Sequence, residues 1–255
     1  MTAPCALRMG ADWEMRGAMP MSANAWPRRI GGLWGWFRNL MIIAIVLQIL
    51  FVGFESYEIV NGVQTDEDYQ SPATLIWALS GLALGIVWFV VFLLCVVLTC
   101  RLTYRLAKNL HTIGTTVEVT SPGWAVGSYF VPLVNLFMPA RAVTQIWRGT
   151  DQLSKAPMMG SDFIGWWWAF WILSNFASTA SFRMTLESGG MDEFGPTNPQ
   201  LYMGSIYAGV ASSILGAAAC WFMIKVFKPL AQEQDAIVDA HAVKPVPAPP
   251  PSGAR

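Results

Sequence analysis

The chain has 255 residues, of which 54% are hydrophobic and only 13% are charged. Soluble domains carry roughly 25% charged residues, so this composition excludes a single soluble domain, and the high hydrophobicity excludes a disordered chain. Sixteen basic residues balance sixteen acidic ones, so the net charge gives no sign of nucleic-acid binding. The sequence indicates an all-α integral membrane protein. Its expected partners are the lipid bilayer and other membrane proteins or a second copy of itself.

Residues 1–30 are predicted to be a flexible cytoplasmic N-terminus. They contain no compact apolar core followed by a small-residue cleavage site, which is the pattern of a secretory signal peptide. The first long apolar segment follows Arg28 and Arg29 directly. We therefore expect this segment to act as a retained signal-anchor.

Four segments are predicted to be transmembrane helices, because a helix needs ~20 mostly apolar residues to cross a hydrocarbon core of ~30 Å. They pair in chain order into two hairpins and place a four-helix membrane domain at residues 31–230. Tryptophans near the starts of the first and third segments are expected at the membrane interface. The four segments are Leu33–Phe54, Ala73–Cys100, Phe163–Phe182 and Leu201–Ile224.

Small residues recur four positions apart in the second and fourth segments, a spacing that lets helices approach closely. We expect these residues to pack helices together: Gly81, Gly85, Gly209, Ser213 and Gly216. Hydroxyl and amide residues in the third segment are expected to form hydrogen bonds between helices. These are Ser174, Asn175, Ser178, Thr179 and Ser181.

A fifth apolar stretch, residues 121–140, is interrupted by Pro132 and Pro139. If it does not cross, every Lys and Arg except Arg183 falls on one side of the membrane, which the positive-inside rule identifies as the cytoplasm. The stretch is therefore predicted to be either re-entrant or interfacial, a wedge sheltered by the glycine-bearing faces of the second and fourth segments. Four crossings with both termini cytoplasmic follow. Asn135 is expected to pair a carbonyl group that the prolines leave without a donor.

No catalytic, cofactor-binding or metal-binding residues are predicted. The two histidines, His111 and His241, lie outside the apolar segments and are expected to face solvent. The four segments contain no ionisable side chain apart from Arg38 near one end, whereas proton relays and ion-coupled transporters keep such groups at membrane depth. Four cysteines are too few for a disulfide framework.

The run SPGWAVGSYFVPLVNLFMPARAV, with YRLAKNL upstream, resembles the signature of an uncharacterised bacterial membrane-protein family, domain of unknown function 4328. The resemblance covers about residues 33 to 230. It implies a bacterial inner-membrane protein and transfers no catalytic residue, because the family has no assigned reaction. The matching motif residues are Pro122, Gly123, Trp124, Ala125, Val126, Gly127, Tyr129, Phe130, Pro132, Asn135, Leu136 and Pro139.

Three functions remain open at this point. The first is a non-enzymatic scaffold or accessory subunit of a larger membrane assembly, which the uncharged, tryptophan-rich segments favour. The alternative is a passive channel or carrier for a small solute that uses residues 121–140. A membrane enzyme acting on lipids ranks last. Residues 231–255, which end in a proline-rich run, are predicted to be a disordered cytoplasmic tail.

Overall fold

The computed structural model describes residues 27–61, 72–189 and 196–242. Within these ranges the fold is helical and contains no strand. The expected flexible start and proline-rich end, residues 1–26 and 243–255, lie outside the described residues. Residues 231–242 were expected in the tail but belong to the last helix, because that stretch buries an apolar face that includes Ile237 and Val238.

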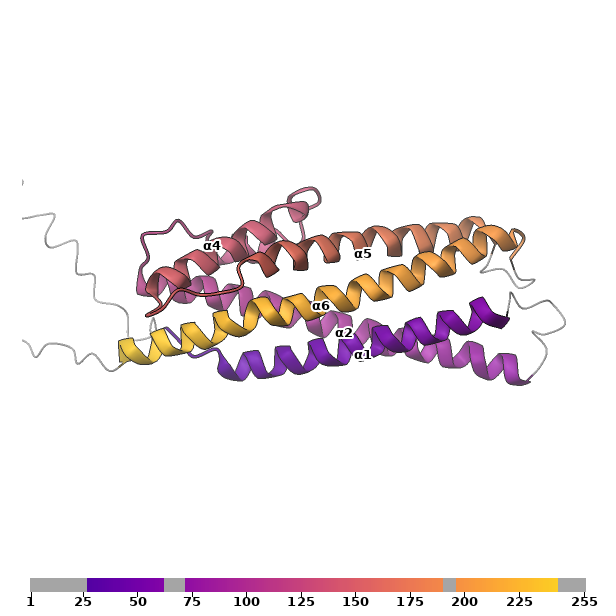
Figure 1. Ribbon diagram of the computed structural model, residues 1–255, viewed down its shortest axis with the longest axis horizontal. Helices are drawn as coiled ribbons and strands as arrows, with labels where there is room; N and C mark the ends of the chain where they lie inside the picture. The colour runs from indigo at the N-terminus through magenta and orange to yellow at the C-terminus, as the bar shows by residue number, and fades with distance from the viewer. Residues whose placement is uncertain (1–26, 62–71, 190–195, 243–255) are drawn as a thin grey trace, which may run out of the picture.

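Four long helices lie side by side along the long axis of the molecule (Figure 1). α6 packs against both α1 and α5, and α1 also packs against α2, so two antiparallel hairpins meet along α1 and α6. The elements in chain order are α1 (Gly31–Asn61), α2 (Pro72–Ile113), α3 (Pro122–Gly127), the short 3-10 helix η2 (Val134–Leu136), α4 (Met138–Leu153), α5 (Asp162–Glu187) and α6 (Pro199–Ala242).

Three of the described helices, α1, α2 and α6, are long and apolar enough to cross a membrane. The prediction of four such helices is corrected on this point, because α5 does not reach the required hydropathy. Its tryptophans, its hydroxyl residues and Arg183 all lower the average. α5 nevertheless has 26 residues, which at 1.5 Å per residue extend ~39 Å. It runs beside α6 from the end that carries α4 to the opposite end (Figure 1).

Apolar side chains are exposed in one half of the molecule and buried in the other. Along α2, side chains such as Leu82, Phe89 and Leu93 point outward and are about half exposed, as expected for helices surrounded by lipid. At the end that carries α4, Leu106 of α2, Ile146 of α4 and their neighbours form a closed apolar core. The chain thus has a membrane-type half and a compact head, which we call the helical head: residues 27–30, 101–120, 138–161 and 225–242.

The helical head forms because α2 and α6 continue far beyond their apolar parts. α2 has 42 residues and α6 has 44, so each is ~63–66 Å long, about twice the hydrocarbon thickness. In the extension of α2, Leu102, Leu106 and Leu110 recur at helical spacing and are fully buried. α4 packs its own apolar face against both extensions.

The interface between α5 and α6 is closed by hydroxyl groups. The Ser174 hydroxyl donates to the Ser212 carbonyl at 3.1 Å, the Ser212 hydroxyl donates back to the Ser174 carbonyl at 3.1 Å, and Ser181 donates to the Ser205 carbonyl at 2.8 Å. Asn175 instead donates to the carbonyl of its own helix one turn back. The expected polar cluster is therefore divided between interhelical and local bonds.

The first span was expected to end at Phe54. α1 instead continues to Asn61, so Glu55 and Glu58 lie on the helix and face α6. The Tyr202 hydroxyl of α6 lies 3.5 Å from Oε2 of Glu58. Acidic side chains therefore enter the interface at the end opposite the helical head, which the hydropathy pattern alone did not predict.

Candidate functional site

Residues 121–137 form a short hairpin on the side of the bundle. The carbonyl of Thr120, just before α3, lies 3.2 Å from Nε2 of His111 near the end of α2. The amide of the same residue donates to Oε1 of Gln145 in α4 at 3.0 Å. The chain therefore enters this segment and returns from it at the helical head. α3 packs against α2 and α4.

The turn of this hairpin is a strained one. Leu133 has φ +64° and ψ −47°, and the Val134 amide donates to the Pro132 carbonyl at 2.8 Å. This is a γ-turn with positive φ at a residue other than glycine, a rare conformation. The turn exposes apolar side chains, with Leu133 78% exposed and Phe137 73% exposed.

Trp168 of α5 fixes the far side of the hairpin, because its Nε1 donates to the Leu136 carbonyl at 2.9 Å. We expected the Asn135 side-chain amide to donate to such a carbonyl, but this side chain makes no hydrogen bond within the described residues, and its acceptor Oδ1 is also buried without a partner. The indole takes the role instead. Trp167 and Trp168, expected at the membrane interface, are 2% and 8% exposed and belong to the core.

On its inner side the hairpin packs against α2. The Tyr129 hydroxyl is buried beside the Thr103 hydroxyl of α2, without a hydrogen bond of ordinary geometry. Burial raises the pKa of Tyr129 well above its usual value, and the Thr103 hydroxyl opposes this by a smaller amount. Ser128 is fully buried and donates to the Ala125 carbonyl at 3.3 Å. The expected shelter from the glycines of α2 is absent, since the contact lies near residues 100–104.

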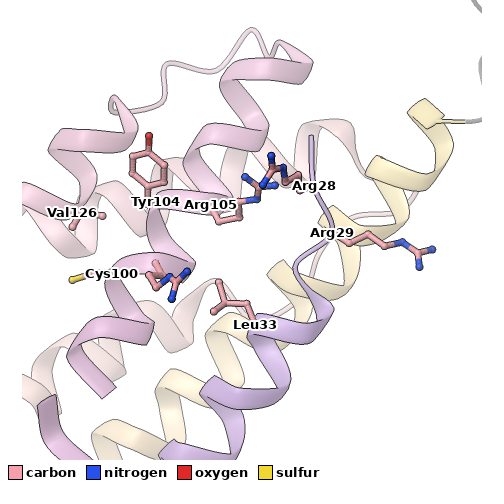
Figure 2. Close-up of a pocket in the computed structure, with 8 residues that line it drawn as sticks. Arg28, Arg29, Leu33, Cys100, Tyr104, Arg105 and Val126 are labelled. Atoms are coloured by element: carbon pink, nitrogen blue, oxygen red, sulfur yellow. The ribbon is translucent and has the colours of Figure 1, made fainter. Parts of the chain in front are cut away.

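Beside this hairpin lies a cavity of about 560 Å³ that is open to the outside. Figure 2 shows the cavity between α2, α3 and residues 27–30, which we call the N-terminal segment. Four of its eight lining residues are arginines, and none of the eight is acidic. The lining residues are Arg28, Arg29, Leu33, Cys100, Arg101, Tyr104, Arg105 and Val126. We call this cavity the arginine pocket.

The arginines of this pocket are not equivalent. Arg29 turns toward α6 (Figure 2), where its guanidinium binds the Asp239 carboxylate with N–O distances of 2.7 and 2.5 Å. The guanidinium groups of Arg28 and Arg105 lie close together and repel each other. Nη2 of Arg105 is buried without a hydrogen-bond partner. The pocket therefore concentrates positive charge and an unsatisfied donor.

A buried amide pair holds the N-terminal segment in place beside the pocket. Oδ1 of Asn109 accepts from the Arg28 amide at 3.2 Å, and its Nδ2 donates to the Arg28 carbonyl at 3.1 Å. Gln234 of α6 then connects Asn109 to the Leu106 carbonyl and to the Thr150 hydroxyl. Residues from α2, α4 and α6 thus fix the backbone from which Arg28 projects.

The small residues predicted to pack helices lie in different surroundings. A Cβ added at Gly81 would lie 2.7 Å from the Phe54 ring, and one at Gly216 would lie 2.8 Å from the Gln48 amide. Gly209 packs against the Glu55 carboxylate, and Ser213 is 7% exposed. Gly85 has no neighbour within 4 Å of such a Cβ.

The arginine pocket was not predicted, because Arg101 and Arg105 were interpreted as markers of the cytoplasmic side and as the basic face of an amphipathic helix. Their spacing of four residues places two like charges on one helix face, which destabilises an isolated helix. That spacing was the available signal. The part of the chain that the structure describes contains no group of three or more metal-binding side chains.

The family model described as Domain of unknown function (DUF4328) matches residues 72–232. The match covers more than half of the chain, and the chain therefore belongs to that family. It includes the hairpin, α4 and the arginines of α2. No curated protein and no solved structure matches the chain.

Proposed function

We propose that this member of the DUF4328 family is a scaffold or accessory subunit of a larger membrane assembly. The observation that supports the proposal best is the division of the fold into a lipid-facing bundle and a closed helical head. The bundle anchors the chain, and the buried network around Asn109 and Gln234 keeps the head in a fixed orientation to it. A membrane anchor with a head in fixed orientation can hold partner proteins at a defined place on the membrane.

Aromatic residues support a membrane position for the bundle. On α1, Trp36 and Tyr57 are 71% and 47% exposed, and the helix between them is ~32 Å long, close to the hydrocarbon thickness of ~30 Å. On α6, the Lys225 ammonium lies 4.6 Å from the centroid of the exposed Trp221 ring. Tryptophan and lysine together are typical of a membrane interface.

We place α5 in the membrane as the fourth crossing helix. It runs beside α6 over the apolar part of that helix, and Ser174 and Ser181 turn their hydroxyl groups toward α6. Polar groups that bond to a neighbouring helix are compatible with membrane depth. The positive-inside bias then puts the helical head and both ends of the chain on the cytoplasmic side of a bacterial inner membrane.

In this placement the hairpin at residues 121–137 is a shallow re-entrant segment. Its exposed apolar turn, which includes Phe130, Leu133 and Phe137, points away from the head and enters the cytoplasmic leaflet. Non-helical backbone is tolerated at membrane depth where protein surrounds it. Contacts with α2 on one side and Trp168 of α5 on the other supply that support.

The close packing within the bundle favours a scaffold over a channel. Gly209 and Gly216 of α6 let Glu55 and Gln48 of α1 approach the α6 backbone so closely that a methyl group at either glycine would displace the end of the facing side chain. The hairpin, expected to line a solute path in the channel alternative, packs on the outside of α2. Neither feature provides a route through the bundle.

The proposal is tested by extracting the full chain from its native membrane in a mild detergent and measuring the mass of the complex. A particle with a second copy or a partner in fixed ratio is expected. A monodisperse monomer with no partner would contradict the proposal. Reconstituted liposomes provide the second measurement, and solute flux above that of protein-free liposomes would support the channel alternative instead.

A further inference from the structure

Three of the four guanidinium groups around the arginine pocket have no acidic partner among the described residues. Asp239 neutralises Arg29, but no carboxylate in the described ranges lies within 4.0 Å of Arg28, Arg101 or Arg105. Holding like charges together is unfavourable, and a buried donor without an acceptor adds a further penalty. An anion with several acceptor oxygens would remove both penalties.

The position of the pocket indicates where that anion comes from. The pocket lies where the apolar surfaces of α1 and α2 give way to charged ones, with Leu33 and Cys100 on its apolar side. Two exposed indoles lie nearby in the chain, Trp36 on α1 and Trp124 on α3. Because indoles favour the membrane interface, the pocket opens at the level of the lipid headgroups.

We propose that the arginine pocket binds the phosphodiester headgroup of an anionic phospholipid of the cytoplasmic leaflet. The planar guanidinium groups of Arg101 and Arg105 match phosphate oxygens in geometry and charge. Basic pockets between membrane helices on the cytoplasmic side bind acidic lipid headgroups. A volume of about 560 Å³ accommodates such a headgroup, while Leu33 and Val126 provide apolar walls for the start of an acyl chain.

A free phosphate ion would satisfy the same guanidinium groups but would leave Leu33 and Val126 uncovered. The lipid covers both parts of the pocket, and for that reason the lipid is the occupant we assign. The assignment rests on the membrane placement proposed above and is independent of the scaffold role. A failure to bind lipid would therefore leave the mass measurement of the assembly unaffected.

The test uses the full-length chain purified in a neutral detergent. Its melting temperature is measured with added dioleoylphosphatidylglycerol, with dioleoylphosphatidylcholine and with inorganic phosphate, and native mass spectrometry counts the retained lipids. We expect phosphatidylglycerol alone to raise the melting temperature and to remain bound. Equal stabilisation by inorganic phosphate would overturn the lipid assignment in favour of a soluble anion, and no stabilisation by either would overturn the site.

Variants then locate the effect. Arg101→Gln and Arg105→Gln are each expected to weaken phosphatidylglycerol binding about fivefold to tenfold, the factor for one basic residue at a charged membrane surface. Arg105→Lys keeps the charge but not the planar fork and should lose less. Arg38→Gln is the matched control, because Arg38 is an exposed arginine of α1 outside the pocket lining, and among the described residues its guanidinium forms hydrogen bonds only with the adjacent Asn39.

Arg101 is exposed, so its replacement should leave folding intact, and gel filtration checks each variant for this. If Arg38→Gln weakens binding as much as Arg101→Gln, the lipid is attracted by general surface charge and the pocket is not its site.

Discussion

The side-chain amide of Asn109 in α2 donates a hydrogen bond to Oε1 of Gln234 in α6 at 3.2 Å, across 125 positions of the chain. Both side chains are buried, with exposures of 1% and 0%. Asn109 also binds both backbone groups of Arg28, and Gln234 also binds Thr150 of α4. This one contact therefore connects the N-terminal segment with three helices of the helical head.

Replacing Asn109 by Leu is expected to lower the free energy of unfolding by about 2–4 kcal/mol, because the Arg28 amide and carbonyl and the Gln234 amide oxygen lose a buried partner. Thermal unfolding in detergent measures the change. Asn39→Leu is the control, since Asn39 is exposed and bonds only to the neighbouring Arg38. A loss no larger than that of the control would show that the network contributes little.

The double variant Asn109→Leu with Gln234→Leu should lose less stability than the sum of the two single losses. Residues in one hydrogen-bond network are energetically coupled, and removing both partners leaves fewer unsatisfied groups than removing one. Strict additivity of the two losses would mean that the direct contact at 3.2 Å has no energetic role.

Gly81 and Gly85 of α2 have the spacing of a helix-packing motif, yet the structure predicts opposite effects when each is replaced by Ala. The added methyl at position 81 meets the Phe54 ring at 2.7 Å, and that ring is stacked on Trp77 with centroids 4.0 Å apart. Gly81→Ala should cost about 1–3 kcal/mol of stability. Gly85→Ala meets no atom within 4 Å and should be neutral or stabilising by up to ~1 kcal/mol. Equal melting temperatures for the two variants would contradict this assignment.

The apolar spans of α1, α2 and α6 were predictable because hydropathy and length are properties of the segment itself. The helical head was not predicted as a compact unit. Its helices carry both charges and leucines, and a sequence pattern shows that one face is apolar without showing what covers it. In α2, the spacing of Leu106 and Leu110 shows an apolar face, and only the contacts with α4 and α6 show that this face belongs to a closed core.

The errors at the hairpin have a similar cause. Proline positions showed which carbonyl groups lose a donor, but they did not show which side chain replaces it. Asn135 is near in sequence, whereas Trp168 is near in space and takes the role. The arginine pocket depends on the approach of Arg28 to α2, a contact between residues about 80 positions apart that no local spacing encodes.

Leu133→Gly is expected to stabilise the chain by about 1 kcal/mol, because glycine adopts positive φ without the strain that leucine has there. Val131→Gly is the matched control, two positions before Leu133 in the same hairpin. Among the described residues other than glycine, Leu133 alone has a positive φ. Glycine at position 131 therefore relieves no backbone strain. It should lower the free energy of unfolding by about 0.5–1 kcal/mol, because glycine loses more backbone freedom on folding than valine does. Thermal unfolding in detergent gives both values. A loss of stability in both variants would show that the Leu133 side chain contributes more than its strain costs.

The buried hydroxyl of Tyr129 predicts a loss of stability at alkaline pH. Burial raises the pKa of this tyrosine in the folded state above its usual value of 10, so the neutral form is the one that the fold accommodates. The corresponding stability is present below pH 10 and is lost as the pH rises beyond it, because the unfolded chain then releases the proton more readily. Tyr129→Phe should therefore reduce the fall in melting temperature between pH 9 and pH 11, about one unit on either side of that value. Tyr104→Phe, at a side chain that is 41% exposed, should keep the wild-type fall, and equal behaviour of the two variants would exclude Tyr129 as the cause.

The last prediction concerns α5, the one of the four proposed crossing helices that hydropathy alone does not identify as a membrane span. Lys155 precedes this helix and Glu187 is its final residue, and both side chains are exposed. In a cysteine-free background, Lys155→Cys and Glu187→Cys should therefore lie on opposite sides of the membrane. A membrane-impermeant thiol reagent applied to intact cells should label position 187 at once and position 155 only after permeabilisation. Arg148→Cys on α4 is the control for the cytoplasmic side and should behave like position 155. Labelling of positions 155 and 187 from the same side would show that α5 does not cross, and the chain would then have three crossings with its ends on opposite faces.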